Sequence, residues 1–163
     1  MYTNRCNINF TSIFLRRPDA SAAVRGSEKY PDINGRVNFY QTRMGVIVSA
    51  EISGLPQNQD KCEQPVFGFH IHSGTQCEGN ADDPFAGAQG HYNPDECMHP
   101  YHAGDLPPLF GTDGCAFSAF LTDRFSVKDI IGKTVIIHAS PDDFMTQPSG
   151  NSGLKIACGE IRV

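Results

Sequence analysis

The chain has 163 residues, of which 39% are hydrophobic and 19% charged, and its formal net charge is −5. This length fits one domain with a sizeable core, and the composition excludes a coiled coil and a disordered tail. The acidic balance supplies no basic stripe for nucleic acid, and no apolar run approaches the roughly 18 residues of a membrane span. We therefore expect a globular protein that binds neither nucleic acid nor membrane.

The first 19 residues precede the β-rich part of the chain. They contain one early basic residue, Arg5, polar residues among the apolar ones, and then Arg16 and Arg17. This mixture differs from the continuous apolar region of a signal peptide. We interpret residues 1–19 as an N-terminal extension and 20–163 as the domain. We expect a cytoplasmic protein, with export by an unrecognised signal as the alternative.

Short segments of β-type sequence follow, separated by turns rich in Gly and Pro. From Val46 to Ile52, apolar residues recur with period two, which predicts a half-buried strand within 44–52. The other predicted strands are 37–42, 65–72, 114–121, 133–139 and 154–163, with a weaker one at 21–25. One helical turn is predicted at 126–131, with Ser126 as its N-cap and Gly132 beyond its end.

Two segments interrupt this pattern, 73–113 and 140–153. Both are rich in Gly and Pro and show no clean strand alternation. Long loops inside a compact domain are usually functional or disordered, and both loops here flank strands that end in histidine. The sequence therefore predicts an all-β sandwich or barrel of about eight strands with two long functional loops.

Histidines His70 and His72 lie in the first of these strands. Side chains alternate along a strand, so the two imidazoles share one face about 6–7 Å apart, while Phe69 and Ile71 take the other face. Two imidazoles at this separation can bind one metal ion. A pair of half-exposed strand histidines without a metal is the alternative.

A second group of candidate ligands lies in the loop that follows. His91, His99, His102 and Asp105 offer three imidazoles and a carboxylate, which is a complete tetrahedral donor set for Zn²⁺. Neighbouring Pro and Gly residues exclude a long helix here. The alternative is a polar loop with unrelated histidines. The sixth histidine, His138, ends an apolar run and is either a core residue or a further ligand.

These residues lie in motifs that resemble the copper–zinc superoxide dismutase family. The motifs, in the family's order, are GFHIH at 68–72, GHYNP at 90–94, HAGDL at 102–106, IGKTVIIH at 131–138, GNSG at 150–153 and IACG at 156–159. The resemblance covers roughly residues 20–163 and implies a Greek-key antiparallel β-barrel or sandwich. It also implies an enzyme that converts two superoxide anions and two protons into dioxygen and hydrogen peroxide by alternating Cu(II) and Cu(I).

The resemblance further implies two metal sites that share one catalytic histidine. The implied copper ligands are His70, His72, His91 and His138. The implied zinc ligands are His91, His99, His102 and Asp105. Asp142 falls where the family has a carboxylate that links a copper histidine to a zinc histidine, a contact that would fix ring orientation. A solvated loop carboxylate that caps a turn is the alternative for Asp142.

The positive charge implied at the copper site is Lys155. The family normally has an Arg three residues before its final Cys, and this chain has Lys155 there. Lysine keeps the charge but lacks the planar guanidinium fork, so we expect attraction of the superoxide anion that is retained but weaker. Only two residues separate His99 from His102, a spacing shorter than in many family members.

The resemblance also implies a disulfide between Cys77 and Cys158, which would fasten the first long loop to the barrel. A second bond between Cys62 and Cys115 is a further possibility. Cys97 lies two residues before a candidate zinc ligand and is a candidate competitor for the metal. We expect Cys6 to be free.

Two rival functions remain open from the sequence. One is a protein on the same scaffold that stores or delivers copper and turns over little superoxide. The other is a purely structural β-sandwich module, which leaves the candidate ligands unexplained. The sequence also leaves open whether the protein is a monomer or a homodimer.

Overall fold

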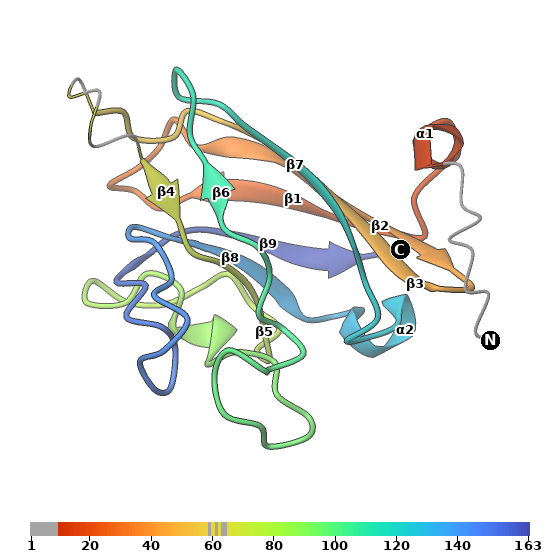
Figure 1. Cartoon of the computed structure of the whole chain (residues 1–163). Helices are drawn as coiled ribbons and strands as arrows, with labels where there is room; N and C mark the ends of the chain where they lie inside the picture. The colour runs from red at the N-terminus through yellow and green to blue at the C-terminus, as the bar shows by residue number, and fades with distance from the viewer. Residues whose placement is uncertain (1–9, 59, 61, 63–64) are drawn as a thin grey trace.

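The computed structural model of the chain (Figure 1) describes residues 10–58, 60, 62 and 65–163. Its strands are β1 (Ala20–Gly26), β2 (Asn34–Thr42), β3 (Gly45–Ser53), β4 (Val66–Phe67), β5 (Phe69–His72), β6 (Leu109–Phe110), β7 (Ala116–Thr122), β8 (Thr134–His138) and β9 (Lys155–Arg162). Two short helices, α1 (Phe10–Ile13) and α2 (Val127–Ile130), and a 3₁₀ turn, η1 (Ala86–Ala88), complete the list.

Within these described residues, seven strands form one curled antiparallel sheet in the order β5-β8-β9-β1-β2-β3-β7. The chain runs through β1, β2 and β3 as a meander, crosses to β5 at the far edge, and returns to β7 beside β3. It then crosses again to β8. These crossovers are the Greek-key arrangement. The short β4–β6 pair precedes the two edge strands, β5 and β7, and links the two sides of the curled sheet.

The main core lies inside the curl of the sheet. It includes Phe39, Phe69, Ile137 and Ile161, all fully buried. A second, smaller cluster lies on the outer face of β8 and β9 and consists of Phe85, Ala88, Ile136 and Cys158, with Cys77 packed against it. The first long loop therefore covers the outer face of these two strands as a packed layer.

The predicted all-β fold is confirmed, with differences at the level of single elements. The predicted strand 65–72 is divided at Gly68 into β4 and β5. The Gly68 N–H donates to Ser140 O at 2.8 Å, and a Cβ at this position would lie 2.9 Å from Ser152, so the second long loop passes directly over the break. Helices α1 and η1 and strand β6 were not predicted because each is too short to show a period.

Helix α2 begins and ends as predicted from its caps. Ser126 is the N-cap, and a capping box with Asp129 satisfies the first turn. Gly132 lies just beyond the helix with φ of 81°, a conformation that glycine adopts without strain. No helix in the described part of the chain has the length and apolar character to span a membrane.

Candidate metal centre

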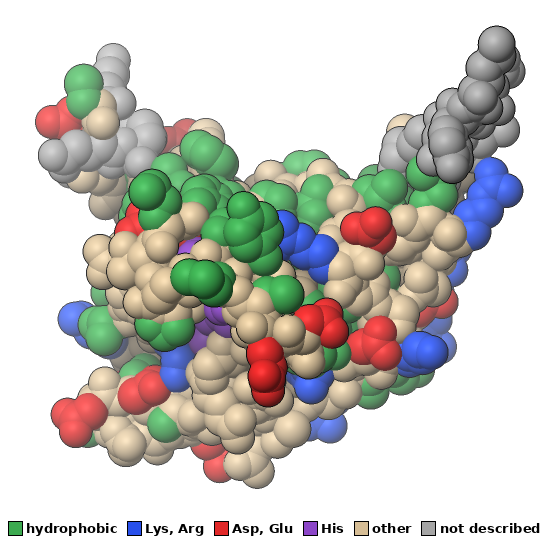
Figure 2. Space-filling view, turned by 60° about the horizontal axis from the view of Figure 1, so that its bottom comes forward, with side chains coloured by type: hydrophobic (Ala, Val, Ile, Leu, Met, Phe, Trp, Pro, Cys, Tyr) green, Lys and Arg blue, Asp and Glu red, His purple; other side chains and the backbone are tan. Residues whose placement is uncertain are grey.

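Four histidines from three segments meet at one edge of the sheet. His70 and His72 come from β5, His138 ends the neighbouring strand β8, and His91 comes from the first long loop. The His138 N–H donates to Gly68 O at 2.8 Å and so fixes the end of β8 beside the start of β5. The ring centroids of His70 and His72 are 6.3 Å apart, as the strand geometry predicted. Figure 2 shows only small areas of histidine at the surface, within a hollow.

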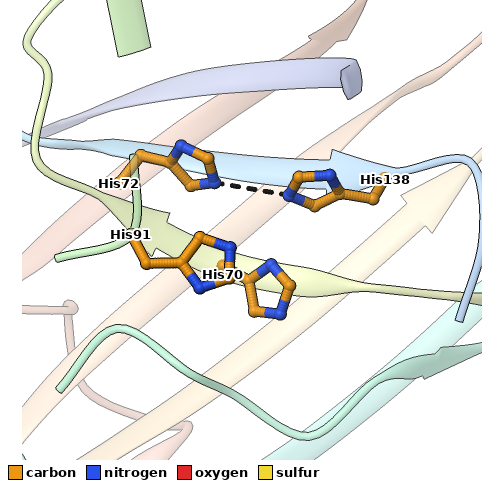
Figure 3. A group of neighbouring side chains, drawn as sticks. All are labelled: His70, His72, His91 and His138. Atoms are coloured by element: carbon orange, nitrogen blue, oxygen red, sulfur yellow. Dashed lines mark hydrogen bonds between the residues drawn. The ribbon is translucent and has the colours of Figure 1, made fainter. Parts of the chain in front are cut away.

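The orientation of two of these rings is set by main-chain carbonyls. His72 Nδ1 lies 2.8 Å from Gln89 O, and His138 Nδ1 lies 3.2 Å from Gly153 O. A carbonyl accepts only, so each Nδ1 carries the proton and each Nε2 keeps a free lone pair. The two Nε2 atoms are 3.3 Å apart (Figure 3). Both lone pairs are therefore available to one metal ion.

The other two rings show more directly that a ligand fits between them. His70 Nδ1 and His91 Nε2 are buried, and neither has a hydrogen-bond partner among the described residues. Leaving a buried polar atom unpaired costs about 1–3 kcal/mol, and a metal ion would supply the missing partner. The ligand atoms of all four histidines lie within 4.8 Å of one another. Four imidazoles in this arrangement suit copper.

A second ligand group adjoins the first. His91 Nδ1 is 2.7 Å from Asp105 Oδ1, and Asp105 Oδ2 is 3.0 Å from His99 Nδ1 and 3.4 Å from His102 Nδ1. The contact of His99 Nδ1 with Asp105 Oδ2 is close but is not a hydrogen bond, so this buried nitrogen has no hydrogen-bond partner among the described residues. The four ligand atoms again lie within 4.8 Å of one another. Three imidazoles and one carboxylate are a complete tetrahedral set for zinc. The short spacing between His99 and His102 therefore still allows all four predicted ligands to converge.

His91 belongs to both groups through opposite ring atoms. Its Nε2 faces the copper-type histidines, and its Nδ1 faces Asp105 and the zinc-type group. The structure thus brings all six histidines of the chain into two adjoining sites. The sharing of His91 was expected from the resemblance alone, and the structure confirms that His91 belongs to both ligand groups.

Asp142 links the two sites from behind, as expected. Its two carboxylate oxygens accept hydrogen bonds from His70 Nε2 at 2.7 Å and from His99 Nε2 at 2.9 Å. Burial alone would raise the pKa of Asp142, but hydrogen bonds from His70, the Phe144 N–H and His99 hold it well below its usual range. The ionised carboxylate keeps a proton on each Nε2 and leaves each Nδ1 free to bind a metal.

The sequence analysis missed two residues that hold this bridge in place. Gly150 has φ of 65°, and a Cβ there would lie 1.9 Å from Asp142 Oδ1 and 2.7 Å from His99 Nε2. The Gln147 side chain accepts from the His99 N–H at 2.9 Å and donates to His99 O at 2.7 Å. The GNSG motif was the one signal for Gly150, and no sequence pattern pointed to Gln147.

Arg124, between β7 and α2, is a third residue that sequence reasoning missed. Its Nη1 donates to three carbonyls of residues 91–105, the part of the first long loop that carries the zinc-type ligands and is called the zinc-type loop below. These carbonyls belong to Pro100, at 3.0 Å, and to His102 and Asp105, at 3.2 Å each. Charged hydrogen bonds of this kind are stronger than neutral ones. Arg124 thereby fixes the main chain at two of the four zinc-type ligands.

His72 and His138 are neutral at neutral pH. Burial lowers the pKa of His72 well below its ordinary value. Burial, together with the charges of His70, His91 and Lys155, lowers the pKa of His138 to about 3. Only neutral imidazole binds a metal, so the protein presents these ligands in the binding form.

Lys155 lies beside this centre as the first residue of β9, in register with His138. Its Nζ donates to Asp83 Oδ2 at 2.6 Å and to Phe85 O at 3.1 Å. The lysine predicted to attract an anion is therefore already paired with a carboxylate. No sequence pattern pointed to Asp83 as its partner.

The structure contains the predicted Cys77–Cys158 disulfide, with the Cα atoms 5.6 Å apart. Cys62, Cys97 and Cys115 are free and exposed in the part of the chain that the structure describes, so the second bond is absent there. The Cys97 thiol is not among the converging zinc-type ligand atoms. Cys6 lies outside the described residues.

The fold and the two donor sets define a Greek-key β-barrel metalloprotein with a copper-type and a zinc-type site joined by one histidine. The family model for copper/zinc superoxide dismutase (SODC) matches residues 33–161. The chain belongs to the copper/zinc superoxide dismutase family.

Similar proteins come from several bacteria. Superoxide dismutase [Cu-Zn] 2 of Aquifex aeolicus is 31% identical over 146 residues, which cover 80% of each chain. The copper–zinc superoxide dismutase of Legionella pneumophila is 32% identical over 152 residues, covering 88% of this chain and 87% of the relative. The solved Cu/Zn superoxide dismutase from Brucella abortus superposes with a TM-score of 0.72 at 23% identity, covering 87% of this chain and 99% of that one, and so supports the fold.

Proposed function

We propose that this protein is a superoxide dismutase that converts two superoxide anions and two protons into dioxygen and hydrogen peroxide. The observation that carries this function is the pair of ligand groups that share His91 through opposite ring nitrogens. When bound, copper supplies one-electron chemistry by alternating between Cu(II) and Cu(I), and zinc supplies a fixed positive charge without redox change.

The residues of this chain have distinct tasks in that reaction. His70, His72 and His138 would hold copper together with His91. His99, His102 and Asp105 would hold zinc on the Nδ1 side of His91. His91 Nε2 is buried and has no hydrogen bond to any described residue; whenever it is not bound to copper, it could hold a proton and give it to the departing peroxide. Asp142 would orient one imidazole ring in each site, His70 in the copper-type site and His99 in the zinc-type site.

Lys155 is proposed to attract the substrate. Superoxide is a small anion, and the chain as a whole is negative, with a formal charge of −5. A local positive charge beside the copper-type site raises the concentration of an anion there. Lys155 interacts electrostatically with His138 and is suitably placed for this role.

A copper storage or delivery protein on the same scaffold is the second candidate, favoured by the pairing of Lys155 with Asp83. The test is to load the protein with copper and zinc, to measure both metals per chain, and to follow superoxide loss with and without cyanide. Cyanide-sensitive loss with one copper and one zinc per chain supports the dismutase. Bound metal without superoxide loss supports storage or delivery. A protein that neither binds metal nor consumes superoxide would be a structural module.

The assembly and the location of the protein are separate proposals. The protein is a monomer or a homodimer, and sedimentation of the metal-loaded protein distinguishes the two. For the location, the cytoplasm is one proposal, and export is the other, which the Cys77–Cys158 bond favours because disulfides persist in oxidising compartments. Fractionation of the producing cells, with the redox state of this bond measured in each fraction, decides between them.

A further inference from the structure

One carboxylate in the first long loop forms an ion pair with the lysine beside the copper-type site. Asp83 Oδ2 pairs with Lys155 Nζ at 2.6 Å, while Asp83 Oδ1 accepts from the Phe85 N–H at 3.1 Å. The Lys155 side chain is only 15% exposed, whereas that of Asp83 is 41% exposed. The lysine is thus enclosed and the carboxylate faces the solvent from which an anion arrives.

The pair is held in place next to the histidines. Lys155 lies opposite His138 in the β8–β9 register, and both Lys155 and Asp83 interact electrostatically with His138. The loop that carries Asp83 is fastened to β9 by the Cys77–Cys158 bond. Acidic and basic side chains both lie around the hollow in which histidine is visible (Figure 2).

The pairing has opposite consequences for position and for charge. Two of the three Nζ protons go to Asp83 and to Phe85 O, which orients the lysine and leaves one proton for a ligand. An ion pair, however, has no net charge, and its attraction for an anion falls off faster with distance than that of a lone lysine.

We propose that Asp83 limits the rate at which superoxide reaches the copper-type site by neutralising Lys155. Asp83 is a positioning residue that acts through Lys155, and its removal would increase attraction of the substrate. The inference rests on the proposed function for the identity of the substrate, but not for the capture of an anion.

The test compares Asp83→Asn with Asp82→Asn in the copper- and zinc-loaded protein. Each change removes one negative charge, and Asp82 is the exposed neighbour that does not pair with Lys155. Asparagine keeps an oxygen that can accept from the Phe85 N–H. Binding of azide, a small anion that binds Cu(II), is followed by absorbance at several ionic strengths, and superoxide loss is measured in parallel.

We expect Asp83→Asn to tighten azide binding about two- to fivefold and to steepen its dependence on ionic strength, since one nearby negative charge is removed. Asp82→Asn should change binding by less than about 1.5-fold because its charge is more exposed to solvent. The gain from Asp83→Asn should be clearly smaller in a Lys155→Gln background, because only the loss of one negative charge remains there and no lysine is released from the pair.

Three outcomes would overturn the proposal: equal effects of the two aspartate changes, weaker azide binding in Asp83→Asn, or a gain that is just as large without Lys155. Thermal unfolding checks that the variants fold, and Asp83→Ser, which also keeps an oxygen acceptor, replaces Asp83→Asn if that variant does not. Azide binding is read without turnover. A wild-type protein that binds azide but does not consume superoxide would therefore contradict the proposed function while leaving the role of Asp83 tested.

Discussion

Asp142 accepts one hydrogen bond from a histidine of each metal site, and Gly150 leaves it the room to do so. A methyl group at position 150 would meet both Asp142 and His99, so Gly150→Ala must displace the carboxylate or the ring. Loss of such a supporting contact typically lowers metal affinity 10- to 100-fold. We expect a loss of zinc affinity of about this size, measured by competition with a chromophoric chelator.

The matched control for this change is Gly132→Ala. Gly132 also has a positive φ, of 81°, but a Cβ there meets no described atom within 4 Å. Both variants carry the same kind of backbone strain, and only one of them disturbs the metal centre. Equal zinc affinity in the two variants would show that the room beside Asp142 does not matter.

Residue chemistry explains which parts of the site could be predicted. The ligands were identifiable because imidazole and carboxylate are the groups that bind copper and zinc, and their spacing placed His70 and His72 on one face. Gly150 and Gln147 act through shape and main-chain contacts that arise only after the second long loop has folded over His99. Such contacts leave no periodic pattern in the sequence.

At the scale of elements, the connection between β7 and α2 supports the zinc-type loop through Arg124. Arg124→Gln removes the charged donor that holds three carbonyls, including those of His102 and Asp105. We expect the free energy of unfolding to fall by about 1–3 kcal/mol and zinc to bind more weakly, with copper affinity unchanged. Urea unfolding and separate metal titrations measure these effects.

Arg36→Gln is the control for the change of charge. Arg36 is exposed on β2, on a strand that contributes no ligand, so its loss should alter stability by less than about 0.5 kcal/mol. If Arg124→Gln weakened copper and zinc binding equally, Arg124 would support the fold in general and not the zinc-type loop in particular.

The Cys77–Cys158 bond joins the first long loop to β9 across a sequence separation of 81 residues. Replacing both cysteines with serine should lower the free energy of unfolding of the metal-free protein by about 2–4 kcal/mol. Urea unfolding measures this change, and Cys115→Ser, at an exposed free thiol, is the control. An unchanged free energy in the double variant would mean that the packing of Phe85 and Ala88 alone holds the loop.

Strands with a clear alternation were predictable, whereas the internal order of the loops was not. The period of two in β3 marks the face that packs in the main core, which is a local property of the chain. The prediction that the other face is exposed was wrong, because Ile47 and Ser49 are also buried and only Glu51 is exposed. By contrast, the layer that the first long loop forms over Ile136 depends on contacts with β8 and β9, far away in sequence. The same holds for the approach of Asp83 to Lys155, which are 72 residues apart.

At the scale of the whole molecule, the metal-free protein keeps histidines buried although no bound metal offsets the free-energy cost of burying them. The pKa of His138 is lowered to about 3, chiefly by burial and then by the charge of His70, and burial also lowers the pKa of His72. In the unfolded chain both titrate near 6.5. Below about pH 6.5 the unfolded state therefore binds protons that the folded state does not, and acid favours unfolding.

We accordingly expect the free energy of unfolding of the metal-free protein to fall as the pH drops from about 6.5 towards 3, with a slope of up to about 1.4 kcal/mol per pH unit for each such histidine. Above pH 6.5 these histidines are neutral in both states and contribute no slope. Asp142 acts in the same direction at lower pH, because its depressed pKa gives stability that is lost as acid protonates it. Urea unfolding of the metal-free protein between pH 7.5 and 4.5 measures the effect, and His138→Gln should reduce the slope by the share of one histidine. A flat profile below pH 6.5 would mean that the metal-free protein does not keep these histidines buried and neutral, so that the centre closes only when the metals bind.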